Sequence, residues 1–112
     1  MRRLLLCGLL AMTACEAPDW RAQQIARAVE KIRSEVGEPS AQFSKLQLTG
    51  DQNTGQTCGV VQEAHNAPAR FIVYIDGTAG PYIEGGGGAE YLNQDRFDFV
   101  WQNDCVAEGY DQ

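Results

Sequence analysis

Apolar residues recur with a helical period in the first third of the chain. They stand four, three and four positions apart, at Ile25, Val29, Ile32 and Val36. Such spacings place side chains on one face of a helix. Asp19 is a suitable N-cap or first-turn acid, Gly37 is placed for a left-handed C-terminal cap, and Pro39 prevents continuation. The pattern predicts an amphipathic helix that packs on a sheet.

Shorter apolar runs follow the helix and predict a small antiparallel sheet. Residues 38–43 are expected to form a single helical turn that delivers Phe43 into the core. Residues 44–49 alternate, with Leu46 and Leu48 on one face, as in a half-buried strand. Further strands are predicted at 56–62, 70–76 and 82–84. The run 70–76 is apolar on both faces, which is typical of a central strand. Polar or glycine-rich turns separate the strands, at 50–55, 63–69, 77–81 and 85–88.

The last apolar segment, residues 93–105, fits two periods. Phe97, Phe99 and Trp101 match a strand, whereas Phe97, Val100, Trp101 and Asp104 match a helix. The period alone does not decide between them. The polar start at residues 93–95 favours a helix. Residues 106–112 are acidic and are expected to be frayed.

The first 15 residues have the order of a secretory leader. Two arginines precede an apolar run from Leu4 to Met12, which is too short to span a bilayer. Met12-Thr13-Ala14-Cys15 resembles a bacterial lipobox, with Met12 where leucine is commoner. A lipobox implies that residues 1–14 are removed and that Cys15 becomes a diacylglycerol-modified N-terminus. An ordinary cleavable signal peptide is the alternative. Residues 15–18 would link the anchor to one small domain reaching residue 112.

Charge limits the classes of partner. Loss of Arg2 and Arg3 with the leader leaves seven of the nine basic residues against 15 acidic ones, a net charge of −8. A surface of that sign repels phosphate backbones and anionic lipid headgroups, so no nucleic-acid partner is expected. No second apolar segment approaches the length of a membrane span. Any membrane attachment is therefore expected through the N-terminal lipid.

The cysteines suggest a disulfide. Cys7 leaves with the leader and Cys15 takes the lipid, so Cys58 and Cys105 remain. Two thiols in an oxidising compartment most often pair. The closed loop of 48 residues would stabilise the fold by roughly 4 kcal/mol on chain-entropy reasoning. The alternative is a reactive Cys58 that works with His65, which leaves Cys105 without a role.

The loop at 63–69 holds the candidate binding residues Glu63, His65 and Asn66. Cys58, His65 and Asn66 have the residue types of a thiol hydrolase, in which a base lowers the thiol pKa and is itself oriented. A disulfide would consume the thiol. A single histidine with scattered carboxylates offers no zinc-ligand spacing. Neither a metal nor a cofactor is therefore expected.

Two other stretches resemble ligand-binding loops only superficially. Residues 51–55 start like a calcium loop, but Gln56 stands at the sixth position and Gln62 at the twelfth, so a polar turn is expected. Four glycines at 85–88 lack the lysine of a phosphate-binding loop. The glycines are flanked by Glu84 and Glu90, which could serve as an acid–base pair but are more typical of a solvated rim.

Several of these stretches together resemble a family of small proteobacterial cell-envelope proteins and lipoproteins. The matching segments, in order, are Glu38-Pro39-Ser40-Ala41-Gln42-Phe43, Cys58-Gly59-Val60-Val61, Phe71-Ile72-Val73, and Phe97, Trp101 and Cys105. They span about two thirds of the chain after the leader. Relatives carry an asparagine-rich Val-Asn-x-x-Asn segment where this chain has residues 61–66, which match only in part. The resemblance implies a C-terminal helix and an envelope location, but no activity.

These observations predict an α+β domain with an N-terminal helix, an antiparallel sheet of three or four strands, and a C-terminal helix tied to the sheet by Cys58–Cys105. The expected function is that of a non-enzymatic, lipid-anchored protein facing the periplasm, which binds another envelope protein or supports envelope structure. The alternative is a small envelope hydrolase that uses Glu63, His65 and Asn66. A deep pocket around His65 would favour the enzyme, and a shallow exposed loop would favour the interaction module.

Overall fold

A computed structural model of the chain describes residues 19–86 and 90–112. The predicted leader, the lipobox with Cys15, and Gly87 and Gly88 of the glycine run lie outside the described residues. The described elements are α1 (Trp20–Val36), β1 (Gln42–Thr49), β2 (Gln56–Gln62), β3 (Ala69–Tyr74), β4 (Tyr82–Ile83), α2 (Gln94–Trp101) and the π-helix η3 (Gln102–Val106).

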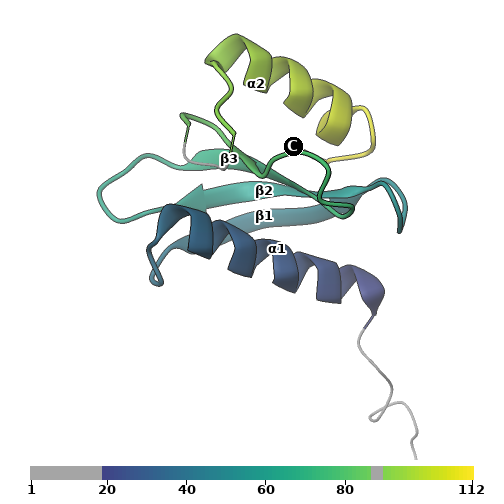
Figure 1. The fold of residues 1–112 in the computed structure, drawn as a ribbon, viewed down its shortest axis with the longest axis horizontal. Coiled ribbons are helices and arrows are strands. Elements are labelled where there is room, and N and C mark those ends of the chain that lie inside the picture. The colour runs from purple at the N-terminus through teal and green to yellow at the C-terminus, as the bar shows by residue number, and fades with distance from the viewer. Residues whose placement is uncertain (1–18, 87–89) are drawn as a thin grey trace, which may run out of the picture.

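The four strands form one antiparallel sheet in the order β1-β2-β3-β4. The two α-helices cover opposite faces of this sheet (Figure 1). The predicted α+β class is confirmed, as are the N-terminal helix, the antiparallel sheet and the C-terminal helix. β3 lies between two other strands, as expected for the most apolar run.

α1 forms where its apolar period and its end signals agree. Ile32 at the centre of the apolar stripe is fully buried. Gly37 takes the left-handed conformation with φ 69°, and its N–H donates to the Arg33 carbonyl at 2.8 Å. Glycine adopts that conformation without a steric cost, so the helix ends where predicted. Asp19 occupies the N-cap position, although its side chain makes no capping hydrogen bond.

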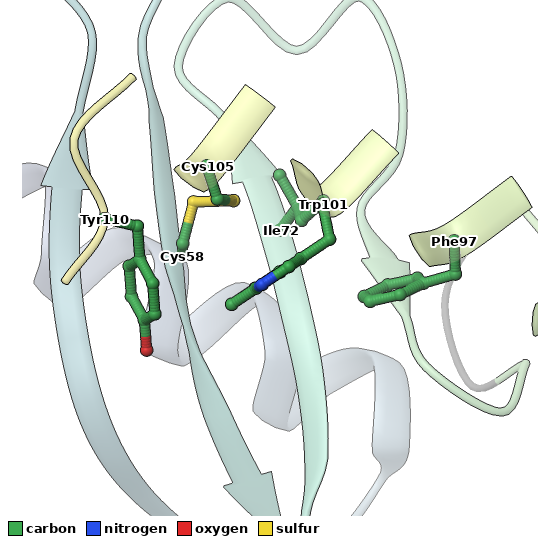
Figure 2. Packing of buried hydrophobic residues seen from close by; sticks show 6 residues of the cluster. All are labelled: Cys58, Ile72, Phe97, Trp101, Cys105 and Tyr110. Carbon is green, nitrogen blue, oxygen red and sulfur yellow. A yellow bond between two sulfur atoms is a disulfide. The ribbon is translucent and has the colours of Figure 1, made fainter. Parts of the chain in front are cut away.

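The core has two layers, one on each side of the sheet. On the α1 side, Ile32 packs with residues of β2, β3 and β4, namely Val61, Phe71 and Ile83. On the α2 side, the cluster is Cys58, Ile72, Phe97, Trp101, Cys105 and Tyr110 (Figure 2). Alternate residues of β2 and β3 therefore supply the two layers, since successive side chains of a strand point to opposite faces.

The start of the sheet differs from the prediction. Residues 38–43 were expected to form a helical turn, but Gln42 already begins β1 and Phe43 pairs with Val61 of β2. The Phe43 ring meets the Phe71 ring edge-on at 5.8 Å between centroids. Strand pairing and this aromatic contact outweigh the local preference for a turn, which is confined to the residues before Ala41.

The predicted alternation of β1 is also wrong in detail. The register with β2 shifts between Ser44 and Gln47, and Lys45 has a φ of 53°. β1 thus contains a bulge-like irregularity, after which its side chains lie on the opposite faces from those that strict alternation predicts. Leu46, Gln47 and Leu48 are all half-buried as a result.

The C-terminal segment is a helix, not a strand. The Asn93 side chain accepts a hydrogen bond from the Arg96 N–H at 2.9 Å and so caps α2. Phe97 and Trp101 then face the sheet, whereas Phe99 is 63% exposed. Cys105 follows in η3 and is bonded to Cys58 with an S–S distance of 2.04 Å. The predicted disulfide between the sheet and the C-terminal helix is therefore present (Figure 2).

Tyr110 and Asp111 hold the end of the chain against the molecule, contrary to the expected frayed tail. Tyr110 is only 6% exposed, and its hydroxyl donates to the Lys45 carbonyl at 2.8 Å. The Asp111 N–H donates to Gln47 Oε1 at 2.8 Å. The acidic composition suggested solvation, and residues 107–109, 111 and 112 are indeed exposed, but the buried Tyr110 fixes this end of the chain on the molecule.

Candidate functional site

The loop between β2 and β3 presents the only histidine of the sequence. His65 is exposed and has a φ of 72°, which is uncommon for a residue with a side chain. The Asn66 N–H donates to the Glu63 carbonyl at 3.2 Å and closes the turn. Such a conformation costs of order 1–3 kcal/mol and persists only where its surroundings impose it.

The surroundings of this loop include a carboxylate from the connection between α1 and β1. Glu38 Oε2 accepts hydrogen bonds from the Ala64 N–H at 2.9 Å and from Ser40 Oγ at 3.1 Å. Gln62 Nε2 donates to the Asn66 carbonyl at 3.4 Å. The loop is therefore attached at its base to a segment 26 residues earlier in the chain.

These two segments border a groove, here called the β2–β3 groove, of about 390 Å³. Its lining residues are Glu38, Ser40, Gln42, Gln62, Glu63, Ala64 and His65. Five of the seven are exposed and the other two are half-buried, so the groove is an open surface feature. The structure brings the predicted Glu63 and His65 to the groove. Asn66 is not in its lining and instead braces the loop through its backbone.

The predicted alternative of a reactive Cys58 is wrong for this structure. Cys58 is fully buried on the α2 side and is bonded to Cys105. His65 lies in the exposed loop beyond the end of β2. A thiol hydrolase needs a free thiolate beside its base, so Cys58, His65 and Asn66 do not form one.

The side chain of Asp51 closes the turn before β2. Asp51 Oδ1 accepts from the N–H groups of Asn53 and Thr54, at 2.9 and 2.7 Å, and from Thr54 Oγ1 at 3.0 Å. These hydrogen bonds lower the pKa of Asp51, and those from the two backbone N–H groups have the largest effect. The segment that begins like a calcium loop is thus a polar turn whose carboxylate satisfies backbone donors.

Glu84 is half-buried and paired, contrary to the predicted solvated rim. It accepts two hydrogen bonds from the Arg70 side chain, Nε to Oε1 at 3.1 Å and Nη2 to Oε2 at 2.7 Å. The Arg70 hydrogen bonds lower the pKa of Glu84 to about 2. Glu84 is therefore ionised at every pH above about 2, so it carries no proton near neutral pH and is a poor general acid. Glu90 is exposed. Burial, followed by the effect of the Glu90 carboxylate, raises the pKa of Tyr82, so the two glutamates act on different partners.

Sequence reasoning missed Arg70 as an organising residue. Its Nη2 also donates to Asp98 Oδ1 at 2.6 Å, and Gln94 Nε2 donates to both Glu84 and Asp98 at 2.9 Å. The guanidinium carbon lies 5.1 and 5.2 Å from the ring centroids of Phe97 and Trp101. The sequence could have indicated the Arg70–Glu84 pair, because an antiparallel hairpin that pairs Phe71 with Ile83 also places Arg70 opposite Glu84.

A second missed pair joins β3 to η3. The Tyr74 hydroxyl donates to Asp104 Oδ2, and burial followed by this hydrogen bond raises the Tyr74 pKa. The Tyr74 ring meets Tyr82 edge-on at 5.9 Å between centroids. In the sequence, Asp104 stands out only as a position in a helical period. Its contact with Tyr74 required the helix to be placed over the sheet, which residue spacing does not specify.

Among residues 19–86 and 90–112, no cluster of three histidine, cysteine or acidic side chains is arranged to hold a metal ion. No helix in that part of the chain has the length and apolarity needed to cross a membrane. No protein family, curated protein or solved structure matches this chain.

Proposed function

We propose that this protein is a non-enzymatic, lipid-anchored component of the bacterial cell envelope that faces the periplasm and binds another envelope protein through the β2–β3 groove. The observation that carries the proposal is the presentation of His65. Its side chain is exposed on a loop held in a costly backbone conformation and attached at its base to Glu38. A rigid loop loses less conformational freedom on binding, which favours recognition.

The lipid anchor is supported by Met12-Thr13-Ala14-Cys15. α1 begins five residues after Cys15, and extended chain spans at most about 3.5 Å per residue. A lipid on Cys15 would hold Trp20 within about 18 Å of the membrane surface. The partner is then expected at the same membrane surface.

The anchor is tested by expression in bacteria with labelled palmitate. The wild-type chain should be labelled, and Cys15→Ala should abolish the label. Labelling that survives this substitution would exclude Cys15 as the lipidated residue.

The partner is tested by capture from solubilised envelopes with the full chain as bait. The groove variant is Glu63→Gln with His65→Ala. The control is Asp95→Asn with Asn103→Ala, which changes the charge equally at exposed positions on α2 and η3. The wild type and the control should recover the same envelope protein, and the groove variant should recover about fivefold less, as for loss of about 1 kcal/mol. Equal recovery by the groove variant would contradict the proposal.

One observation supports a hydrolase as the second candidate. Ser40, Glu63 and His65 line the same groove and have the residue types of a serine hydrolase. However, Ser40 Oγ donates to Glu38, whereas an activated serine donates to its histidine. A fluorophosphonate probe, which reacts with activated serines, should leave the protein unlabelled. Labelling at Ser40 that disappears in His65→Ala would establish the hydrolase instead.

A further inference from the structure

A second hollow lies at the opposite end of the sheet from the β2–β3 groove. The groove adjoins the end where Gln42 pairs with Gln62, whereas this cavity adjoins the end where Gln56 pairs with Tyr74. Its volume is about 220 Å³, and it lies between α1 and the turn after β3. The turn contributes Gly77, Ala79, Gly80 and Pro81.

Two cations from α1 line this cavity. Arg27 and Lys31 stand four residues apart, so they lie on the same face of the helix. Within the described residues, neither makes a salt bridge or a hydrogen bond from its side chain. By contrast, Arg21, Arg33 and Arg70 each have a carboxylate within 4.0 Å. Two uncompensated cations beside one cavity are notable in a chain of net charge −6.

The rest of the lining is mixed. Ala28 and Val73 supply apolar surface, and Gln24 and Thr57 supply hydrogen-bonding groups. Thr57 is only 1% exposed, so the cavity reaches the sheet itself. A volume of about 220 Å³ is below the roughly 300–1,000 Å³ of pockets for drug-sized ligands. Both cations are exposed, so a solute can reach them.

We propose that this cavity binds a small organic acid. Its oxyanion, a carboxylate or a phosphate, is held between Arg27 and Lys31, because arginine pairs with such groups through two parallel hydrogen bonds and lysine supplies a second positive charge. A short apolar tail lies against Ala28 and Val73. This site shares no residue with the β2–β3 groove, so the test of one site does not depend on the test of the other.

The probes are butyrate, its neutral counterpart butyramide, propyl phosphate, and an anionic phospholipid added to the detergent micelles. The full chain in detergent is titrated, and the amide resonances of Gln24, Thr57 and Gly77 are followed by NMR. Butyrate or propyl phosphate should give saturable shifts, and the tighter of the two identifies the head group. Butyramide should give none. Shifts of equal affinity with butyramide, or shifts with the anionic phospholipid alone, would overturn the proposal.

The variant Arg27→Gln with Lys31→Gln should bind the preferred acid at least about tenfold more weakly, as expected for the loss of charge-assisted hydrogen bonds. The control Lys45→Gln with Arg96→Gln removes the same charge elsewhere and should bind like the wild type. Added salt should weaken binding to the wild-type protein. An affinity that is insensitive to salt, or equal in the cavity variant and the wild type, would contradict an oxyanion site.

Discussion

His65 occupies a backbone conformation that its sequence neighbours do not specify. A polar loop between two apolar runs predicted that the residue is exposed, and it is. The φ of 72° was not predicted, because the loop is held by a hydrogen bond from Ala64 to Glu38, which lies 26 residues earlier in the chain. Long-range hydrogen bonds of this kind leave no periodic pattern, so the sequence indicated where the loop is but not its shape.

His65→Ala should therefore change the free energy of unfolding by no more than about 0.5 kcal/mol, as at other surface positions. His65→Gly should be at least as stable as His65→Ala, because glycine adopts a positive φ without a steric cost. Urea unfolding of both variants measures this. A loss of about 2 kcal/mol or more in His65→Ala would show that the side chain has a structural role.

The paired Glu84 predicts a dependence of stability on pH. Its pKa falls from an ordinary 4.5 to about 2 in the folded chain. Folding therefore favours the ionised form, and this contribution is full above about pH 4.5 and lost as the pH falls through about 2. It amounts to about 1–3 kcal/mol once partial exposure is allowed for.

Urea unfolding near neutral pH and at about pH 2.5 checks this contribution. Glu84→Gln should be less stable than the wild type near neutral pH and should lose less stability on acidification. Glu108→Gln, at an exposed position, should decline like the wild type. Parallel declines in Glu84→Gln and the wild type would contradict the role of this carboxylate.

For the helices and strands, the spacing of apolar residues and the residues typical of helix and strand ends predicted most of the elements in the structure. α1 ends at its glycine and β2 has the predicted bounds, because both were marked by local residue choices. The predictions were wrong at residues 38–43 and across the bulge of β1, where strand pairing outweighs local preference. The helix predicted for the C-terminal segment is confirmed, and the Asn93 cap and the placement of Phe97 and Trp101 over the sheet give its physical basis.

The Cys58–Cys105 disulfide joins the sheet to η3. Because it closes a long loop of the unfolded chain, its reduction should cost up to about 4 kcal/mol and lower the melting temperature. The double variant Cys58→Ala/Cys105→Ala should melt like the reduced wild type. Peptide mapping without reductant should find the two cysteines linked. Alkylation of both without reductant would contradict the bond.

At the scale of the whole molecule, the last residues connect the C-terminus to the first strand. Tyr110 packs edge-on against Trp101, with 4.8 Å between ring centroids, and its hydroxyl reaches Lys45, 65 residues earlier. Composition predicted a frayed tail because its only charged residues, Glu108 and Asp111, are both acidic. The burial of Tyr110 depends on its contacts with Trp101 of α2 and Lys45 of β1, which lie close together only when the helix covers the sheet.

Tyr110→Ala should destabilise the fold by about 3 kcal/mol, as for loss of other buried aromatic side chains. Tyr110→Phe keeps the ring and should cost only about 1 kcal/mol, for the lost hydrogen bond. Thermal or urea unfolding distinguishes the two variants. If Tyr110→Ala is as stable as the wild type, the tail does not contribute to the core.

We propose the β2–β3 groove as the surface that meets an envelope partner. Its most direct test places a photo-crosslinking amino acid at position 65 of the full chain in living cells, with position 103 as the exposed control on the α2 side. Position 65 should give one discrete crosslinked species that position 103 does not give, and Glu63→Gln in the same chain should reduce it. Absence of any species specific to position 65, or an equal yield at position 103, would contradict the claim.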